Sequence, residues 1–461
     1  MERKVGGLVL QLRPREASFA DAVLAFQRGE YARAISILDG SRDARSALLT
    51  ARAFARDGQF SRAFQALMPF DLASFPSMLD CAEHWTLGAT LCVNLGDFTA
   101  ASRFLFSARA YAFSATSSVV EIDYYYAEAQ FAAFAQRDYD AALASAREAL
   151  SIVGNSTKMS DHLSVSSTSL SRARVQHFVG LISGLREQYS EQLRYYRLAL
   201  NEYNASDVQD VGLGAFFARS LAYLVRDFSL TDDAACLRQT IESAQWPSDL
   251  NVARFDIRRA LGWSCVMQGD HLGAFREFRI AAAVAPTLSM QIIASSDRAY
   301  LSRELGETTN ALEELSYAAD VAETVDWNSV GEERMALLLL AQELAHFQPV
   351  TSRRLLEKYR SIKSKVAPNM MDAVDRRPRA YERMAEGTIL LAEGESGRAI
   401  DAFREAYEIW NGLGYDWRAA TVAVELAELT NDSHFLGLAK REGALRPNSW
   451  LARRCVMLSL T

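Results

Sequence analysis

Residues of the types that carry out catalysis or bind metals are present in this chain, but their spacing matches no reactive arrangement. The six histidines lie singly along the 461 residues, with no H-E-x-x-H sequence and no comparable pair of metal ligands. The chain also lacks a G-x-S-x-G turn, which would expose a nucleophilic serine, and a G-x-x-x-x-G-K-S/T loop, which would bind phosphate. We therefore expect no catalytic residue, no metal site and no cofactor, and we do not expect an enzyme.

The closest approach to a nucleophile and a base is Cys92 with His84, eight residues before it. Eight residues span about two turns of a helix, so the two side chains can share one face. We interpret the pair as packing within a helix rather than as a catalytic thiol and imidazole. The number of cysteines is odd and no C-x-x-C pair occurs, which favours buried free thiols in a reducing cytoplasm. The five are Cys81, Cys92, Cys236, Cys265 and Cys455.

The composition is that of an ordered, helix-rich protein. Hydrophobic residues make up 49% of the chain, and only nine prolines occur. The net charge of −7 gives no general attraction to nucleic acids or anionic membranes. No apolar run approaches the ~20 residues of a membrane span, and the apolar N-terminal run is too short for a signal peptide. We expect a cytoplasmic protein with no membrane partner and no direct nucleic-acid partner.

The elements that must position any binding residues follow from a pattern that recurs along the chain. The pattern starts at a glycine. Counted from it, an aromatic or similar ring stands at position +2, an alanine at +5, a large side chain at +9 and a second alanine at +12. One copy consists of Gly269, His271, Ala274, Phe278 and Ala281. Further copies, most of which depart from the pattern at one position, are built around Gly29, Gly58, Gly96, Gly306 and Gly394, and in one copy Arg137 stands where the others have glycine.

Each position of the pattern has a structural role. The glycine ends one helix and reverses the chain, because a left-handed residue there is strain-free for glycine. The alanines let a second helix approach the first closely, and the large residue continues the buried stripe at helical spacing. The pattern therefore predicts a stack of helical hairpins, in which His271 takes the ring position of its copy.

These offsets resemble those of the tetratricopeptide repeat family, in which Trp, Leu-Gly, Tyr, Ala, Phe, Ala and Pro recur in this order. The resemblance covers residues 18–441 and implies an all-α fold, a right-handed superhelical solenoid of about ten to twelve helical hairpins. The copy over 255–286 is the most similar, with Leu261, Gly262, Ala274, Phe278, Ala281 and Pro286.

The regularity of the pattern suggests how the chain is divided. A serine-rich segment over 150–171 and the sequence Trp246-Pro247-Ser248 interrupt the repeats. We expect an N-terminal extension over 1–17, N-terminal repeats over 18–150, degenerate repeats with the serine-rich loop over 151–247, and C-terminal repeats over 248–461.

The C-terminal part has a second resemblance. Residues 402–451 look like the repeat sensor region of large LuxR-type bacterial transcription regulators of the maltose-regulator kind. This resemblance implies, as an alternative function, an effector-sensing module of transcription regulation. Since we identify neither a nucleotide-binding loop nor a helix-turn-helix before Thr461, we do not expect the chain to bind DNA.

A stack of hairpins presents a concave surface, which we expect to be lined by the first helix of each hairpin and to bind a protein or peptide. The expected function is a non-catalytic interaction scaffold, with a small-molecule effector as the alternative ligand. Aromatic and arginine side chains dominate interface energetics, so the candidate groove residues are Tyr124 and Phe131, seven apart, and Arg259 and Trp263, four apart. Packing in the core is the competing interpretation for Tyr124, Phe131 and Trp263.

Residues 358–383 carry eight basic and three acidic side chains, a local excess of 8 − 3 = 5 positive charges. A solvated edge is the first interpretation of this stretch, and a site for an acidic partner segment or for nucleic-acid phosphate is the second. No aromatic residues alternate with these charges in the way that nucleic-acid binding would favour.

Overall fold

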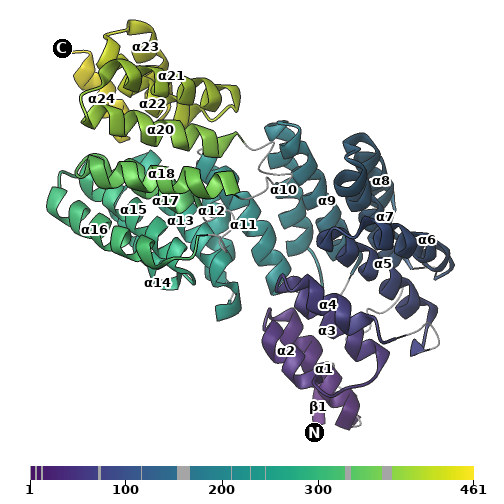
Figure 1. The fold of residues 1–461 in the computed structure, drawn as a ribbon. Helices are drawn as coiled ribbons and strands as arrows, with labels where there is room; N and C mark the ends of the chain where they lie inside the picture. Colours follow the sequence, from purple (N-terminus) through teal and green to yellow (C-terminus); the bar gives the residue numbers. More distant parts are fainter. Residues whose placement is uncertain are drawn as a thin grey trace. The chain divides into compact units, whose positions relative to one another are not determined.

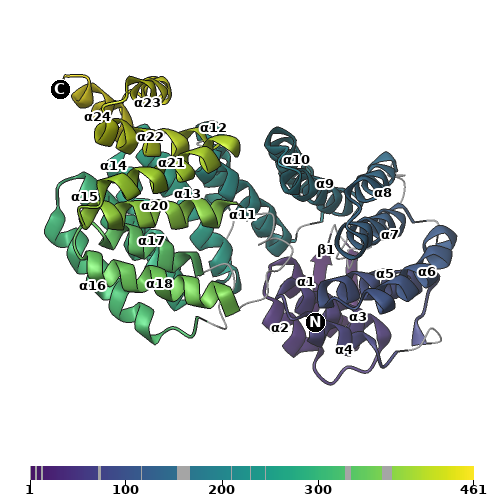
Figure 2. The ribbon, with the colours of Figure 1, turned by 45° about the horizontal axis from the view of Figure 1, so that its top comes forward.

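The computed structural model is built from antiparallel helical hairpins, which pack against neighbouring hairpins within each of two units (Figures 1 and 2). This confirms the all-α, tetratricopeptide-like solenoid that the repeat pattern predicts. The paired helices are α1–α2, α3–α4, α5–α6, α7–α8, α9–α10, α13–α14, α15–α16, α17–α18, α20–α21 and α22–α23. The structure describes residues 2–5, 8–11, 14–70, 74–115, 117–152, 167–208, 210–228, 230–243, 246–327, 334–365 and 376–460.

The chain divides into two compact units. Unit 1 comprises Met1–Phe217 and Ala244–Leu250, and unit 2 comprises Ala218–Ser243 and Asn251–Thr461. The finer division expected from the sequence, with boundaries after 17, 150 and 247, stays a prediction. Most of the serine-rich segment lies outside the described residues.

Unit 1 begins with a short antiparallel β-hairpin, which the helical pattern does not predict. Its register pairs Glu2 with Gln11 and Val5 with Leu8. The elements that fall wholly in this unit are β1 (Glu2–Val5), β2 (Leu8–Gln11), α1 (Pro14–Gln27), α2 (Tyr31–Leu38), α3 (Ala44–Arg56), α4 (Phe60–Leu67), α5 (Met78–Leu95), α6 (Phe98–Ser114), α7 (Ser118–Phe131), the π-helix η2 (Ala132–Gln136), α8 (Tyr139–Ser151), α9 (Thr168–Leu185), α10 (Tyr189–Asn204) and the 3-10 helix η3 (Ser248–Leu250).

Helix α11 (Val211–Phe228) begins in unit 1 and continues into unit 2. The other helices of unit 2 are α12 (Thr231–Ser243), α13 (Asn251–Gln268), α14 (His271–Val284), α15 (Leu288–Glu304), α16 (Thr308–Thr324), α17 (Met335–Leu344), α18 (Pro349–Lys365), α20 (Arg377–Ala392), α21 (Ser396–Gly412), α22 (Asp416–Thr430), α23 (Ser433–Leu445) and α24 (Trp450–Leu458).

The turns between paired helices have the geometry that the pattern predicts. Gly96 ends α5 in the left-handed region with φ of 76°, and the amide of Asp97 donates to the carbonyl of Cys92 at 2.9 Å. Arg137, the residue found in glycine's place, adopts the same conformation with φ of 57°. A side chain in this conformation is strained by roughly 1–2 kcal/mol, so the fourth hairpin keeps the turn at the expense of some stability.

The contact between the two helices of a hairpin depends on small residues. Ala101 and Ala274 are completely buried, at 0% exposure, as their positions in the pattern predict. On the facing first helix, Gly262 leaves room for the ring of Phe278, which would lie 2.4 Å from a Cβ atom added at this glycine. Gly88 stands in the same relation to Phe104, at 2.3 Å.

We predict that Gly262→Ala destabilises unit 2 by about 1–3 kcal/mol, because the added methyl group overpacks the contact with Phe278. The matched control is Gly397→Ala in α21, where an added Cβ meets no atom within 4 Å, and we expect unchanged or slightly higher stability there. Thermal melting of both variants measures the difference. Equal melting temperatures would show that the hairpin does not depend on this close approach.

Candidate functional site

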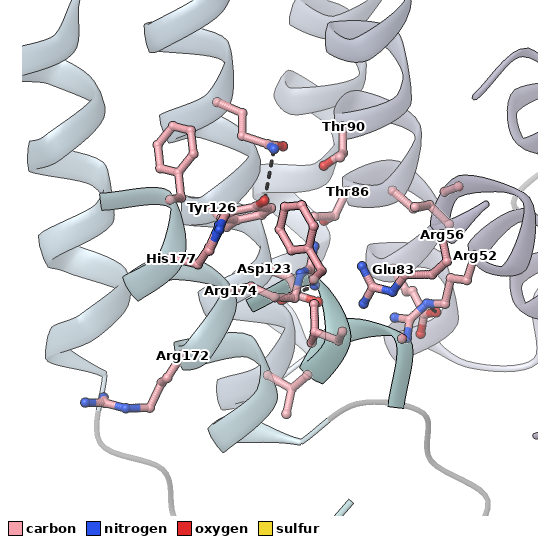
Figure 3. Close-up of a pocket in the computed structure, with 18 of the residues that line it drawn as sticks. Arg52, Arg56, Glu83, Thr86, Thr90, Asp123, Tyr126, Arg172, Arg174 and His177 are labelled. Carbon is pink, nitrogen blue, oxygen red and sulfur yellow. Dashed lines mark hydrogen bonds and ion pairs between the residues drawn. The ribbon is translucent and has the colours of Figure 1, made fainter. Parts of the chain in front are cut away.

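Unit 1 contains a cavity of about 1560 Å³ (Figure 3). Its wall is formed mainly by the first helices of successive hairpins, α3, α5, α7 and α9, together with the start of α11. This is the surface on which the repeat architecture predicts a binding site. In the view of Figure 3, Arg52, Arg56 and Glu83 lie on one side of the cavity, and Tyr126 and His177 lie on the other.

Helices α5 and α7 each turn one regular face toward the cavity. The spacing of three and four residues along each helix places these side chains in a single row, and the rows are mostly polar. The polar row on α5 consists of Glu83, Thr86, Thr90 and Asn94, and Leu79, Leu87 and Leu91 of the same helix line the cavity beside it. The polar row on α7 consists of Asp123, Tyr126 and Gln130, with Val119 and Val120 beside it.

The arginines of the wall are matched by carboxylates from other segments of unit 1. These ion pairs leave the wall without a large excess of either charge. Burial raises the pKa of the Glu83 carboxyl, and the neighbouring Arg52 opposes this shift. The pairs are Arg52–Glu83 (2.7 Å), Arg56–Asp210 (3.2 Å), Arg174–Asp123 (3.2 Å) and Arg172–Glu202 (3.7 Å).

Aromatic rings form a second, apolar part of the wall. Phe178 packs edge-to-face against Tyr126, with ring centroids 5.7 Å apart, and against Phe134 at 6.0 Å. The guanidinium of Arg174 lies 4.7 Å above the ring of Tyr126. The cavity therefore offers an aromatic surface beside the polar rows of α5 and α7.

Two buried polar atoms of the wall make no hydrogen bond within the described part of the chain. They are Oγ1 of Thr86, whose residue is 5% exposed, and Oε1 of Gln130, whose residue is 8% exposed. The amide nitrogen of Gln130 donates to the hydroxyl of Tyr126 at 3.0 Å. Buried polar atoms are usually paired, so unpaired ones that line a cavity indicate where a ligand can bind.

The wall is closed by contacts between residues far apart in the sequence. Asp210 is 1% exposed and accepts hydrogen bonds from the hydroxyl of Tyr31 at 3.5 Å and from Nε of Arg56 at 3.3 Å. The same carboxylate accepts from the amide of Leu213 at 2.9 Å, near the start of α11. Tyr31 also packs so closely that a Cβ atom added at Gly212 would lie 1.5 Å from its hydroxyl.

We predict that Asp210→Ala destabilises unit 1 by about 2–4 kcal/mol, because it removes a buried ion-pair partner of Arg56 and a hydrogen bond near the start of α11. Hydrogen exchange in α2, α3 and α11 measures the effect locally. The control is Arg33→Ala, which breaks an exposed pair with Glu30 and is expected to change stability by no more than about 0.5 kcal/mol. Unchanged protection after Asp210→Ala would show that the contact does not hold the wall together.

His177 lines the cavity and is packed among rings. It stacks on Tyr196 with centroids 4.8 Å and planes 7° apart, and it contacts Phe217 at 5.3 Å. Burial lowers the pKa of His177 to about 3. The imidazole is therefore neutral at pH 7 and unsuited to act as an acid in this environment.

The low pKa of His177 predicts a loss of stability in acid. Between its ordinary value of 6.5 and about 3, the unfolded chain binds a proton that the folded chain does not, so stability falls as the pH decreases through this window. For each protein we compare the free energy of unfolding at pH 4 with its value at pH 7. We expect this loss to be about 1–3 kcal/mol smaller for His177→Gln than for the natural chain. Denaturant unfolding at several pH values tests this, with the exposed His434→Gln as control. Identical pH profiles for His177→Gln and the natural chain would contradict it.

Tyr124 and Phe131 lie on other faces of α7 and do not line the cavity. Tyr124 is buried among rings, edge-to-face with Phe113 at 5.6 Å, and its hydroxyl donates to Glu128 at 3.0 Å. Phe131 packs against the same apolar cluster. Tyr126, two positions after Tyr124, lines the cavity but was not among the candidates predicted from the sequence. Its signal is the row of polar and aromatic residues three and four apart that runs through it.

Arg259 and Trp263 lie in the interior of unit 2. Both donate to the carboxylate of Asp297, Arg259 with two nitrogens and Trp263 with its indole nitrogen at 3.1 Å. The guanidinium of Arg418 lies 4.8 Å above the Trp263 ring. The structure gives each of these residues a packing role, and partner binding by Arg259, Trp263, Tyr124 or Phe131 stays a prediction.

Six basic residues of the stretch 358–383 form ion pairs with the chain's own carboxylates; residues 366–375 lie outside the described part. Glu382, Glu386 and Glu405 accept most of these pairs. This supports the first interpretation of the stretch as a solvated edge. The pairs are Lys358–Glu323, Arg360–Glu382, Arg360–Glu386, Lys363–Glu382, Arg377–Asp227, Arg379–Glu405, Arg383–Glu386 and Arg383–Glu405.

Cys92 and His84 are both buried in the packed interior of unit 1. Burial raises the pKa of the Cys92 thiol to about 11 and lowers that of His84, so neither is poised for nucleophilic chemistry at neutral pH. In the described ranges no three His, Cys, Asp or Glu side chains gather into a possible metal site. Nor does any described helix have the length and apolar character to cross a membrane.

The chain is similar in fold to several solved helical-repeat structures. One is a Rap protein complexed with competence and sporulation factor, with 14% sequence identity and a TM-score of 0.39; the match covers 86% of this chain and 99% of that one. Another is the apo form of the quorum sensor NprR from B. thuringiensis, with 11% identity and a TM-score of 0.44; the match covers 88% of this chain and 98% of that one. A human IFIT1 dimer with PPP-AAAA is also similar, with 12% identity and a TM-score of 0.40; the match covers 98% of this chain and 96% of that one. With TM-scores below 0.5, these similarities do not bear on what the chain binds. No family model and no curated protein matches the sequence.

Proposed function

We propose that unit 1 binds an extended segment of a protein or peptide in its cavity, and that the chain acts as a non-catalytic interaction scaffold. The observation that carries this proposal is the lining of the cavity. Polar rows on α5 and α7 lie beside an aromatic surface formed by Tyr126, Phe134 and Phe178, on helices that are packed against one another.

The size of the cavity supports a polymeric ligand over a small molecule. Sites for small molecules usually measure about 300–1,000 Å³, whereas this cavity measures about 1560 Å³. Helices that are fixed by packing also lower the entropy lost on binding, because the wall does not need to order around the ligand.

The charge of the cavity supports a ligand without a large net charge. Each arginine in the four wall pairs already faces a carboxylate, so an anionic polymer would have to displace a partner at each step. A peptide can instead use the hydroxyl and amide groups of Thr86, Thr90 and Gln130 and the neighbouring rings. This also agrees with the expectation that the chain does not bind nucleic acid.

A selection of displayed peptides against the full chain tests the proposal. We expect enriched sequences, whose affinity is then measured for the natural chain and for Thr90→Trp, a substitution that fills the cavity from α5. The affinity should fall at least about tenfold, because the indole occupies the space of the ligand. The matched control, Ser102→Trp, adds the same side chain at an exposed position of the second helix α6 and should leave the affinity unchanged.

Two outcomes would contradict the proposal. Peptides that bind the natural chain and Thr90→Trp equally would place binding elsewhere on the molecule. A small molecule that copurifies with the natural chain and is lost from Thr90→Trp would instead support the effector-sensing alternative.

A further inference from the structure

The free hydroxyl of Thr86 differs from the hydroxyls of two other threonines within helices, Thr388 and Thr430. The hydroxyl of Thr388 donates to the carbonyl of Met384 at 2.9 Å, and that of Thr430 donates to Leu426 at 2.6 Å. This return to the carbonyl four residues earlier is the usual way for a helical threonine to satisfy its hydroxyl. Thr86 makes no such bond although it is almost fully buried, and its side chain lines the cavity.

Gln130 supplies a second free acceptor on the neighbouring first helix. Its amide nitrogen is already bonded to the hydroxyl of Tyr126, and this bond leaves the carbonyl oxygen as the group without a partner. Helices α5 and α7 pack directly against each other. Two polar oxygens without partners therefore lie on adjacent helices of one wall.

Resting on the proposed function, we infer that the polar rows of α5 and α7 bind the main chain of the peptide, with Oγ1 of Thr86 and Oε1 of Gln130 accepting its N–H groups. The aromatic surface of Tyr126, Phe134 and Phe178 takes one of its apolar side chains. The rows thus fix the register of the peptide, and the rings select a residue within it.

The chemistry of the two oxygens leads to this class of ligand. An amide oxygen is only an acceptor, so whatever satisfies Gln130 must be a hydrogen-bond donor. An extended peptide presents N–H groups along each edge and alternates its side chains between two faces, so one edge can meet a polar row while one face meets the rings. The charges of Arg174 and Asp123, which line the same cavity, are paired with each other at 3.2 Å rather than directed at a ligand.

The test uses the tightest peptide from the selection, with each of its backbone nitrogens methylated in turn. We expect one or two positions at which methylation lowers the affinity at least about tenfold. Thr86→Val, which keeps the shape of the side chain, should weaken the unmodified peptide about 3- to 10-fold, which corresponds to one hydrogen bond. Because the hydroxyl has no partner in the free chain, the melting temperature of Thr86→Val should stay the same or rise.

The decisive measurement combines the two changes. At a sensitive position, methylation should have little further effect on binding to Thr86→Val or to Gln130→Leu, because the bond is already lost. The matched control is Gln176→Leu on α9. Its Oε1 is also buried without a hydrogen bond in the described chain, but its side chain does not line the cavity, so binding should be unchanged.

The outcomes separate this inference from the proposed function. Suppose that Thr90→Trp blocks the peptide, but Thr86→Val and Gln130→Leu bind it as tightly as the natural chain does. The main-chain contact is then refuted, while the peptide site stands. The same conclusion follows if Thr90→Trp blocks the peptide and the effects of methylation and substitution are independent. If Thr90→Trp does not block binding, the site itself is refuted.

Discussion

The close approach of two helices within each hairpin is the constraint on which the rest of this structure depends. Alanines at 0% exposure, such as Ala101 and Ala274, and glycines that face aromatic rings, such as Gly262 and Phe278, set the distance between paired helices. Because this contact occupies one side of every first helix, another side is left to face the neighbouring first helices and the cavity. The packing residues between paired helices, which do not line the cavity, therefore determine which side chains of a first helix face it.

A second regularity is the way in which arginines join successive repeats. Arg174 with Asp123 in unit 1, and Arg259 with Asp297 in unit 2, connect first helices 51 and 38 residues apart. Breaking such a pair by removing one partner leaves a charge in a poorly solvated place, which is strongly unfavourable. The pairs thus favour one alignment of each repeat on the next, and they hold the side chains of the wall in fixed directions.

The fold was predictable from sequence because its signals are local. The turn glycines, the ring two residues later and the buried alanines all lie within a short stretch, and even Arg137 was identified as a replacement for glycine. The wall was not predictable in the same way. Tyr124 and Tyr126 differ by two positions, which is over half a turn of a helix, and only packing decides that the first is in the core and the second in the cavity. Asp210 meets Tyr31 across 179 residues, a separation at which no pattern in the sequence connects them.

The long-range contact of Asp210 also changes how unit 1 is expected to fold. In an ordinary solenoid each repeat contacts only its neighbours, so repeats can form in succession and add their stabilities. Here Tyr31 and Arg56, in the first two hairpins, gain the buried partner Asp210 only when a segment 179 and 154 residues later, respectively, is in place. The entropy of closing that loop must be offset before the contact contributes, which slows the last step and makes it cooperative. During synthesis, the early hairpins therefore emerge and assemble before the residue that completes their wall has left the ribosome.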